Sequence, residues 1–275
     1  MTAVPEPLAT ATMKLSAKTL ILDLLLATEG EPLSAREAIS ACALFGIRES
    51  NVRVVLLRLS TEGLIEASDR GVYRLCGAAH QLAGEVATWR TAEARAGVWS
   101  GDWLAVHSGP LGRSDRQRLK QRQRALDMLG FRELDPGLLL RPDNLDGGVD
   151  AVRARLVKLG LEAGAGVFIA RGFDGERRQR IDRLWDGKAL DARYRTRRRE
   201  LETWMRRAAQ LDPAVAARES FLIGRQAIRD VVFDPLLPAP MVDVDARHAF
   251  VEVVRAYDRI GQRIWRQVRG LPAMP

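Results

Sequence analysis

The chain has 275 residues, 47% of them apolar, so it can bury the cores of two or three domains. Its formal net charge is +8 and its pI is near 10.1, which suits a polyanionic partner. No run of about 18 uncharged apolar residues is present to span a membrane, and the N-terminus lacks the pattern of a secretory signal.

Three short helices are predicted in the first 65 residues. The first begins after Ser16, a good N-cap, and ends before Gly30, and the second begins at Ser34. The third lies in GIRESNVRVVLLRLSTEGLI (46–65), where apolar residues recur at helical spacing: Val52, Val55, Leu56 and Leu59. LIEASDRGVYRLC then alternates about a DRG turn and predicts a hairpin. Three helices followed by a hairpin are the order of a winged helix-turn-helix.

A second set of elements follows the hairpin. Residues 78–97 predict an amphipathic linker helix, and residues 103–107 predict a strand. A basic helix (SDRQRLKQRQRALDMLGF), a strand pair about RELDPGLLLRP, a helix (DAVRARLVKLG) and a strand (AGVFIA) come next. This order indicates a small ferredoxin-like sandwich. From Phe173 onward the pattern is helical, interrupted by the proline-rich loop FDPLLPAP.

The sequence therefore predicts an α+β protein with an N-terminal winged helix-turn-helix, a central ferredoxin-like α/β sandwich and a C-terminal helical domain. The predicted parts are a disordered or loosely ordered N-terminus (1–14), a winged helix (15–77), a linker helix (78–97), a ferredoxin-like domain (98–172) and a helical domain (173–270). Cys42 and Cys76 lie among apolar neighbours and are predicted to be reduced thiols in a cytoplasmic protein.

The third helix is the candidate reader of DNA bases. In a helix-turn-helix, the N-terminal part of this element enters the major groove. Arginine pairs with guanine, asparagine pairs with adenine, and valine contacts the methyl group of thymine. The candidate base-contacting residues are Ser50, Asn51 and Arg53, and the outward-facing Val54 is a further candidate for contact with DNA. The candidates for phosphate or minor-groove contact are Arg48 and Arg58 around the helix, and Arg70 and Arg74 on the hairpin.

GIRESNVRVVLLRLSTEGLIEASDRGVYRL resembles the N-terminal winged helix of the PaaX-like regulators, the repressors of phenylacetate degradation. The resemblance continues in WSGDWLAVHSG, PGLLLRPDNL, LWDGKALDARYR and SFLIGRQAIRDVVFDPLLP, so that it covers most of residues 16–268. It implies a winged helix, a central Cas2-like ferredoxin fold and a helical C-terminal domain. It also implies a homodimer that represses a catabolic operon until an aryl-acyl-CoA, such as phenylacetyl-CoA, releases it from double-stranded operator DNA.

The predicted effector-binding residues are Trp99, Trp103, His107 and Arg141. Taken alone, the tryptophans are compatible with core positions or with an aromatic pocket, and His107 with a core histidine or a ligand contact. The three histidines are far apart in sequence and match no zinc site or catalytic triad, so no cofactor, metal or catalytic residue is predicted.

The positive charge is concentrated in the middle of the chain. Residues 1–100 hold 10 Lys/Arg and 11 Asp/Glu, whereas residues 101–209 hold 24 and 16. Two runs contribute most, RSDRQRLKQRQR (113–124) and RYRTRRR (193–199). Phosphate contact with DNA, grip on the phosphates of CoA, links between domains and a solvated, ion-paired helix face are all compatible with these runs.

Two other function classes remain open at this stage. The first is a ligand or protein interaction module that keeps a winged helix only as a packing unit, with the outer face of the third helix covered. The second is a nuclease, which needs carboxylates that converge on a divalent cation. Asp102 lies at the wrong end of its strand for that role, and Asp115 is predicted to be a negative charge at the N-terminus of the next helix, so we expect no enzyme.

Overall fold

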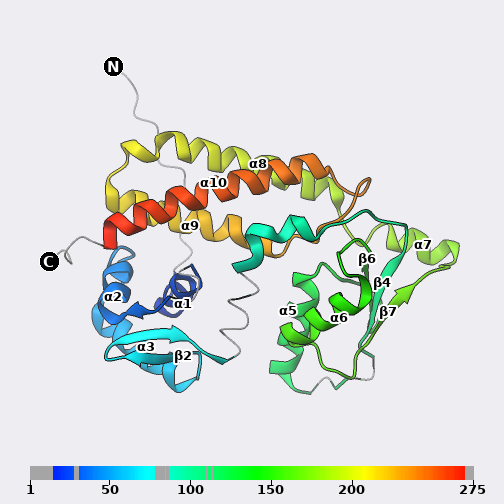
Figure 1. Cartoon of the computed structure of the whole chain (residues 1–275), viewed down its shortest axis with the longest axis horizontal. Coiled ribbons are helices and arrows are strands. Elements are labelled where there is room, and N and C mark those ends of the chain that lie inside the picture. The colour runs from blue at the N-terminus through cyan, green and yellow to red at the C-terminus, as the bar shows by residue number, and fades with distance from the viewer. Residues whose placement is uncertain are drawn as a thin grey trace. The chain divides into compact units, whose positions relative to one another are not determined.

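The computed structural model describes residues 15–27, 31–77, 84, 87–109, 111–112 and 114–269 (Figure 1). The predicted N-terminal segment (1–14) and much of the predicted linker helix lie outside the described residues. The chain divides after Cys76 into two compact units. Both helices and small antiparallel sheets are present, as the predicted α+β class requires.

The first unit follows a helix-strand-helix-helix-strand-strand order. Its elements are α1 (Ala17–Ala27), β1 (Leu33–Ser34), α2 (Ala35–Ala43), α3 (Glu49–Thr61), β2 (Ile65–Asp69) and β3 (Val72–Leu75). The strands form one antiparallel sheet in the order β1-β3-β2. The sequence did not predict β1, because two residues are too few for an alternating pattern.

Side-chain caps begin the first two helices where the sequence placed them. The hydroxyl of Ser16 accepts from the Thr19 amide, and Ser34 forms a capping box with Glu37. The three helices share a buried apolar core that includes Leu20, Leu24, Cys42, Val52, Leu56 and Leu59. Burial raises the pKa of the Cys42 thiol to about 11, so this cysteine stays protonated and unreactive.

The second unit contains a four-stranded antiparallel sheet in the order β5-β6-β4-β7. Its elements follow in the predicted strand-helix-strand-strand-helix-strand order. They are β4 (Trp103–His107), α5 (Arg116–Met128), β5 (Arg132–Asp135), β6 (Leu138–Pro142), α6 (Gly148–Leu159) and β7 (Gly166–Ala170).

Both faces of this sheet are covered. On one face, Leu104 and Val106 of β4 pack with apolar residues of α5 and α6, the two helices seen beside the sheet in Figure 1. On the other face, Trp103 and Ala105 pack with residues that come later in the chain: Ile181, Trp185, Leu237 and Val242. Successive residues of β4 are therefore buried on opposite faces of the sheet. One of these faces shares its core with side chains from residues 181–242.

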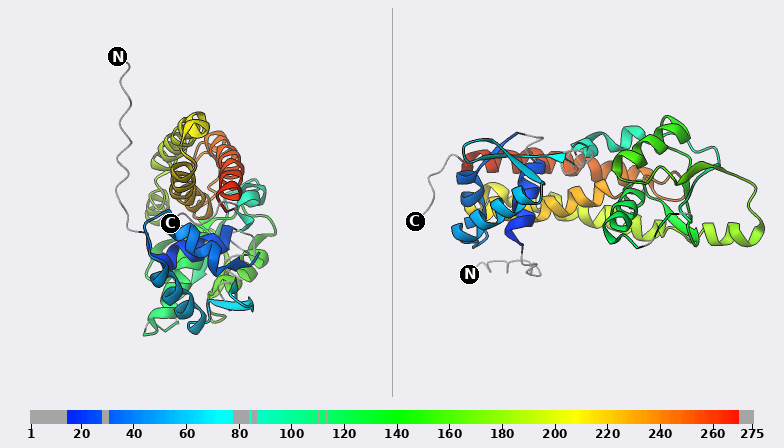
Figure 2. Two further views of the ribbon diagram at one scale, coloured as in Figure 1. Left: turned by 90° about the vertical axis from the view of Figure 1, so that its left-hand side faces the viewer. Right: turned by 90° about the horizontal axis from the view of Figure 1, so that it is seen from below.

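Short and long helices form most of the rest of the described second unit. They are the 3₁₀ helices η1 (Thr88–Arg95) and η2 (Ala208–Gln210) and the α-helices α7 (Gly175–Ile181), α8 (Gly187–Arg207), α9 (Pro213–Val232) and α10 (Val244–Arg269). Helices α8, α9 and α10 run alongside one another (Figures 1 and 2). Their shared core includes Tyr194, Trp204, Phe250 and Tyr257, together with Trp89 of η1.

The described part of the predicted linker helix differs from expectation, because residues 88–95 are 3₁₀-helical. One side of this short helix is buried, because Trp89 and Ala92 insert into the core formed by α8, α9 and α10. Short elements of this kind often adopt 3₁₀ geometry. The predicted proline-rich loop lies between α9 and α10. Among the described residues, no helix combines the length and apolarity that a membrane span requires.

Candidate nucleic-acid interface

Helix α3 has one buried and one exposed face. Val52, Leu56 and Leu59 are at most 3% exposed and hold the helix against α1 and α2. Ser50, Asn51, Arg53 and the apolar Val54 and Leu57 are exposed, with Val54 at 55% and Leu57 at 70%. Helical spacing predicted this division, although Val55, which was predicted to point inward, is only half-buried.

All eight residues predicted to contact DNA are exposed in the first unit. Arg48, Ser50, Asn51, Arg53, Val54 and Arg58 belong to α3 or precede it directly, and Arg70 and Arg74 belong to the β2–β3 hairpin. The structure thus gathers five of the eight on α3 and a sixth, Arg48, at its N-cap, at a surface that is exposed.

Arg53 is held in place by a neighbour on its own helix. Its guanidinium donates to the Glu49 carboxylate, with a shortest distance of 2.7 Å, and the side chains are 65% and 56% exposed. This contact was not predicted, although the spacing of four residues is a readable signal for it. The ion pair orients Arg53 along the exposed face of the helix.

The N-terminus of α3 is not capped by its own N-cap residue. Arg48 occupies that position with extended backbone, and its side chain makes no capping hydrogen bond to the described residues of the helix. The first backbone amides of a helix carry partial positive charge and need acceptors. The start of α3 therefore presents exposed donors beside the positive Arg48 side chain.

The hairpin carries its two arginines on exposed positions. Arg70 lies in the turn beside Gly71, whose φ of +71° suits glycine, and Arg74 of β3 forms a 2.7 Å ion pair with Glu66 of β2. Asp69 accepts a hydrogen bond from the Arg70 amide and fixes the turn. Because Glu66 and Asp69 offset its arginines, the hairpin offers little net positive charge.

The four residues predicted to bind an effector do not form one site. Trp99 and Trp103 meet edge to face at 5.2 Å, and Trp103 also stacks on Trp185 at 5.9 Å. His107 is exposed at the far end of β4, about 13 Å along the strand from Trp103, so it is not a core histidine. Arg141 pairs with Leu104 and lies on the opposite face of the sheet.

Arg141 is buried, at 1% exposed, and its guanidinium donates hydrogen bonds to other groups of the protein. Its guanidinium donates to the carbonyls of Pro142 and Leu129 and to Asn144, and Asn144 donates in turn to the Leu236 carbonyl. Burial lowers the pKa of Arg141 to about 9, which leaves it charged at neutral pH. The residue links the sheet to the loop before α10 and offers no surface to a ligand.

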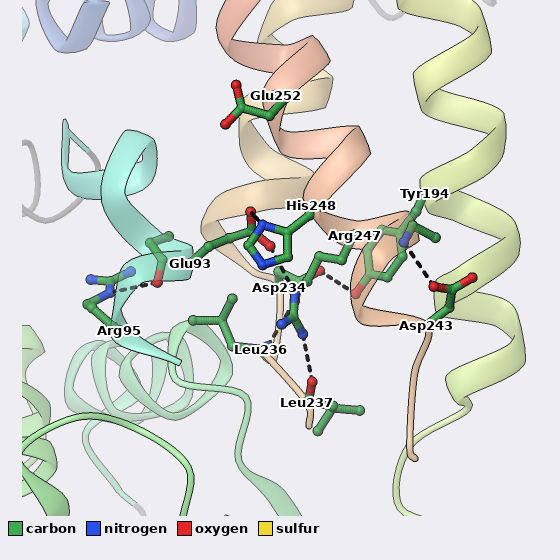
Figure 3. A network of polar contacts seen from close by, with 12 residues as sticks. Glu93, Arg95, Tyr194, Asp234, Leu236, Leu237, Asp243, Arg247, His248 and Glu252 are labelled. Carbon is green, nitrogen blue, oxygen red and sulfur yellow. Dashed lines mark hydrogen bonds and ion pairs between the residues drawn. The ribbon is translucent and has the colours of Figure 1, made fainter. Parts of the chain in front are cut away.

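A second buried polar network, which sequence reasoning missed, joins η1 to α10 (Figure 3). Glu93 of η1 accepts from Arg247 at 3.1 Å and lies 2.9 Å from His248, and Arg247 also donates to the Leu237 carbonyl. Nearby, Tyr194 donates to Asp234, and burial raises the pKa of this carboxyl group. Glu93 and Arg247 are 154 residues apart in the sequence, so no local pattern could have predicted their contact.

Two sequence models of one protein family match the chain. The PaaX-like protein model matches residues 16–79, and the PaaX-like protein C-terminal domain model matches residues 185–267, which together exceed half of the chain. The chain belongs to the PaaX-like family. PaaX-like proteins are transcription regulators and not enzymes, as the resemblance predicted.

A solved structure also resembles this PaaX-like chain. It is the uncharacterized protein Rv0674 from Mycobacterium tuberculosis, with 25% sequence identity and a TM-score of 0.55. The match covers 93% of this chain and 97% of the other, so the likeness extends over both units. No curated protein matches the chain significantly.

The carboxylates considered for a nuclease have other roles in the PaaX-like chain. Asp102 forms a 2.5 Å ion pair with Arg171, and Asp115 caps α5 by accepting from the amides of Gln117 and Arg118. In the part of the chain that the structure describes, no group of three or more His, Cys, Asp or Glu could hold a metal ion.

The two basic runs of the PaaX-like chain differ in how their charges are paired. In the run on α8, Arg195 pairs with Asp243, Arg197 with Asp230 and Glu200, and Arg198 with Glu202. In the run on α5, only Arg118 and Arg122 pair with described acidic residues, the partners being Asp115 and Glu162. Arg113 lies outside the described residues. The interpretation of an ion-paired helix face therefore fits the α8 run better than the α5 run.

Proposed function

We propose that this protein is a DNA-binding transcriptional regulator, acting as a homodimeric repressor whose first unit is a winged helix-turn-helix. Helix α3 enters the major groove of an operator, and the β2–β3 hairpin lies against the DNA backbone. The observation that carries the proposal is the exposed, polar N-terminal half of α3 on a helix anchored by three buried side chains.

The order of elements supports this reading of the first unit. A short strand between the first two helices pairs with the hairpin, so that sheet and helices enclose one core and leave α3 at the surface. The alternative, a winged helix kept only as a packing unit, requires the outer face of α3 to be covered. Exposure of Asn51, Arg53 and Val54 favours the DNA-binding proposal over that alternative.

The Arg53–Glu49 ion pair does not prevent base contact. An exposed pair of this spacing contributes about 0.3–0.5 kcal/mol, whereas a two-pronged arginine–guanine contact contributes about 1–3 kcal/mol of discrimination. Exchanging the carboxylate for guanine is therefore favourable at the correct base pair. In free protein the pair keeps Arg53 extended along the helix and reduces the number of conformations that binding must restrict.

The second unit is proposed to sense the effector, with residues 98–172 as a ferredoxin-like (Cas2-like) domain and residues 173–270 as a helical domain. The proposed effector is an aryl-acyl-CoA such as phenylacetyl-CoA, and the regulated genes serve aromatic acid catabolism. The half-buried Trp99 beside Trp103 supports an aromatic contact, with the exposed Arg171 nearby on Asp102 as a cation for phosphate. Arg141 is not part of this proposal, since it is buried.

The test of DNA reading uses Arg53→Ala and Asn51→Ala. Each substitution is expected to weaken binding to a preferred duplex by about 1–3 kcal/mol and to relax the base preference at one position. Gel-shift titrations at one fixed salt concentration, with duplexes that carry single base-pair changes, measure both effects.

Arg58→Ala is the matched control, because it removes an exposed arginine of α3 that is assigned to phosphate. It should weaken binding to all duplexes equally and leave base preference unchanged. If Arg53→Ala and Asn51→Ala alter neither affinity nor preference, α3 is not the reading helix.

A further inference from the structure

Helix α5 carries a row of three cationic side chains outside the ion pairs of the described residues. Arg116, Lys120 and Arg124 are four residues apart, so they lie along one stripe of the helix, about 6 Å from one to the next. Arg116 and Lys120 are exposed and Arg124 is half-buried. None of the three forms an ion pair with any residue that the structure describes.

The rest of α5 explains why this stripe points outward. Ala125, Leu126 and Met128 are buried in the core between the sheet and α6. Arg122, on the same side of the helix, is buried and donates to both carboxylate oxygens of Glu162. The hydrogen bond from Arg122 lowers the pKa of Glu162, as expected for a structural ion pair. This arginine is thus part of the packing, and the stripe lies opposite to it.

The acidic residues of α5 do not neutralise the stripe. Asp115 caps the helix and pairs with Arg118, and Asp127 pairs with Arg132 at 3.4 Å and accepts from Gln123. Uncompensated cations in a row destabilise a helix slightly, because like charges four residues apart repel. A partner that supplies negative charge at regular spacing relieves this repulsion.

We infer that the α5 stripe (Arg116, Lys120 and Arg124) is a second nucleic-acid contact, which binds the phosphate backbone of duplex DNA independently of base sequence. A helix side is convex and lacks the concave pocket that a CoA thioester needs. It carries no aromatic residue for stacking unpaired bases, and its apolar residues Ala125, Leu126 and Met128 are buried, so that only the half-buried Leu119 could approach a membrane. A regularly spaced polyanion fits these features best.

The inference extends the proposed function from the first unit to the second. The test compares two triple variants of the full chain that lose equal charge. The stripe variant is Arg116→Gln, Lys120→Gln and Arg124→Gln. The control variant is Arg177→Gln, Arg195→Gln and Arg198→Gln, three arginines that are each ion-paired. Affinity for a long duplex is measured by fluorescence anisotropy over a series of salt concentrations.

For the stripe variant, the slope of log affinity against log salt is expected to become shallower by about 2 to 3, since each lost phosphate contact removes about 0.9. The control variant should keep the slope of the unsubstituted chain. If both variants keep the slope of the unsubstituted chain, or if both change it by the same amount, the inference is overturned and the proposed function is left intact. Absence of duplex binding by the unsubstituted chain would contradict the proposed function as well.

Discussion

Arg48 occupies a position where helices favour a short side chain with an oxygen atom. Serine, threonine, aspartate or asparagine at an N-cap accepts a hydrogen bond from the first turn, and arginine has no acceptor to offer. Ser34 and Asp115 cap α2 and α5 in the usual way, whereas α3, the helix that is proposed to bind DNA, and α6, whose N-cap is Gly147, have no side-chain cap among the described residues. A phosphate oxygen is the natural acceptor for these amides.

Arg48→Asn is expected to raise the free energy of unfolding of the first unit by about 1 kcal/mol, because asparagine can cap the helix. The same substitution should weaken duplex binding for all base sequences, since a phosphate contact is lost. Urea denaturation and gel-shift titration measure the two effects. Arg48→Ala, which removes the charge without supplying a cap, should weaken binding and bring no gain in stability; equal stability of the two variants would refute the capping argument.

At the scale of the secondary-structure elements, Gly130 sets how closely the end of α5 approaches the loop after α9. Its φ is +73°, and a Cβ atom there would lie 2.6 Å from the Cα atom of Pro235. The Gly130 carbonyl also accepts a hydrogen bond from the Trp185 indole. This position therefore requires glycine both for its backbone conformation and for the space around it.

Gly130→Ala is expected to lower the free energy of unfolding of the second unit by more than about 2 kcal/mol, because a left-handed alanine costs about 1–2 kcal/mol before the clash with backbone is added. Gly172→Ala is the matched control, with a φ of +71° and no atom within 4 Å of the added Cβ. It should lower stability by about 1–2 kcal/mol only. Equal losses in urea denaturation would mean that the contact with Pro235 is not tight.

Much of the fold could be predicted from the sequence, because helices and strands are encoded locally. Ser16, Ser34 and Asp115 indicate where helices begin, and apolar spacing identifies the buried face of α3. The two-residue β1 gives no such pattern. The 3₁₀ geometry of η1 depends on the docking of Trp89 among helices that follow far along the chain.

The candidate sites were predictable to different degrees. The residues of α3 follow from helical periodicity within one element, so their exposure could be predicted. The effector set combined residues of different strands, and the face on which each side chain lies depends on strand register. Arg141 pairs with Leu104, which places it on the face opposite Trp103, and no local pattern reveals that pairing.

At the scale of the whole molecule, the proposed regulation requires that an effector bind two states of the protein with different affinities. The coupling between sites in such proteins is about 1–3 kcal/mol, which is about 5- to 150-fold in affinity. An aryl-acyl-CoA at micromolar concentration is therefore expected to weaken duplex binding by a factor in this range. Gel-shift titration with phenylacetyl-CoA measures it, with free CoA and acetyl-CoA as controls. Unchanged DNA affinity and unchanged thermal stability across a panel of aryl thioesters would contradict the proposed effector class.

The central claim is that Asn51 and Arg53 of α3 read bases. The most direct measurement is selection of bound duplexes from a random pool by the full chain and by a variant with Asn51→Ala and Arg53→Ala, followed by sequencing. The account predicts that the full chain enriches a defined motif with twofold symmetry and that the variant loses preference at specific positions in each half-site. Enrichment of the same motif by both proteins, or of no motif by the full chain, would contradict it.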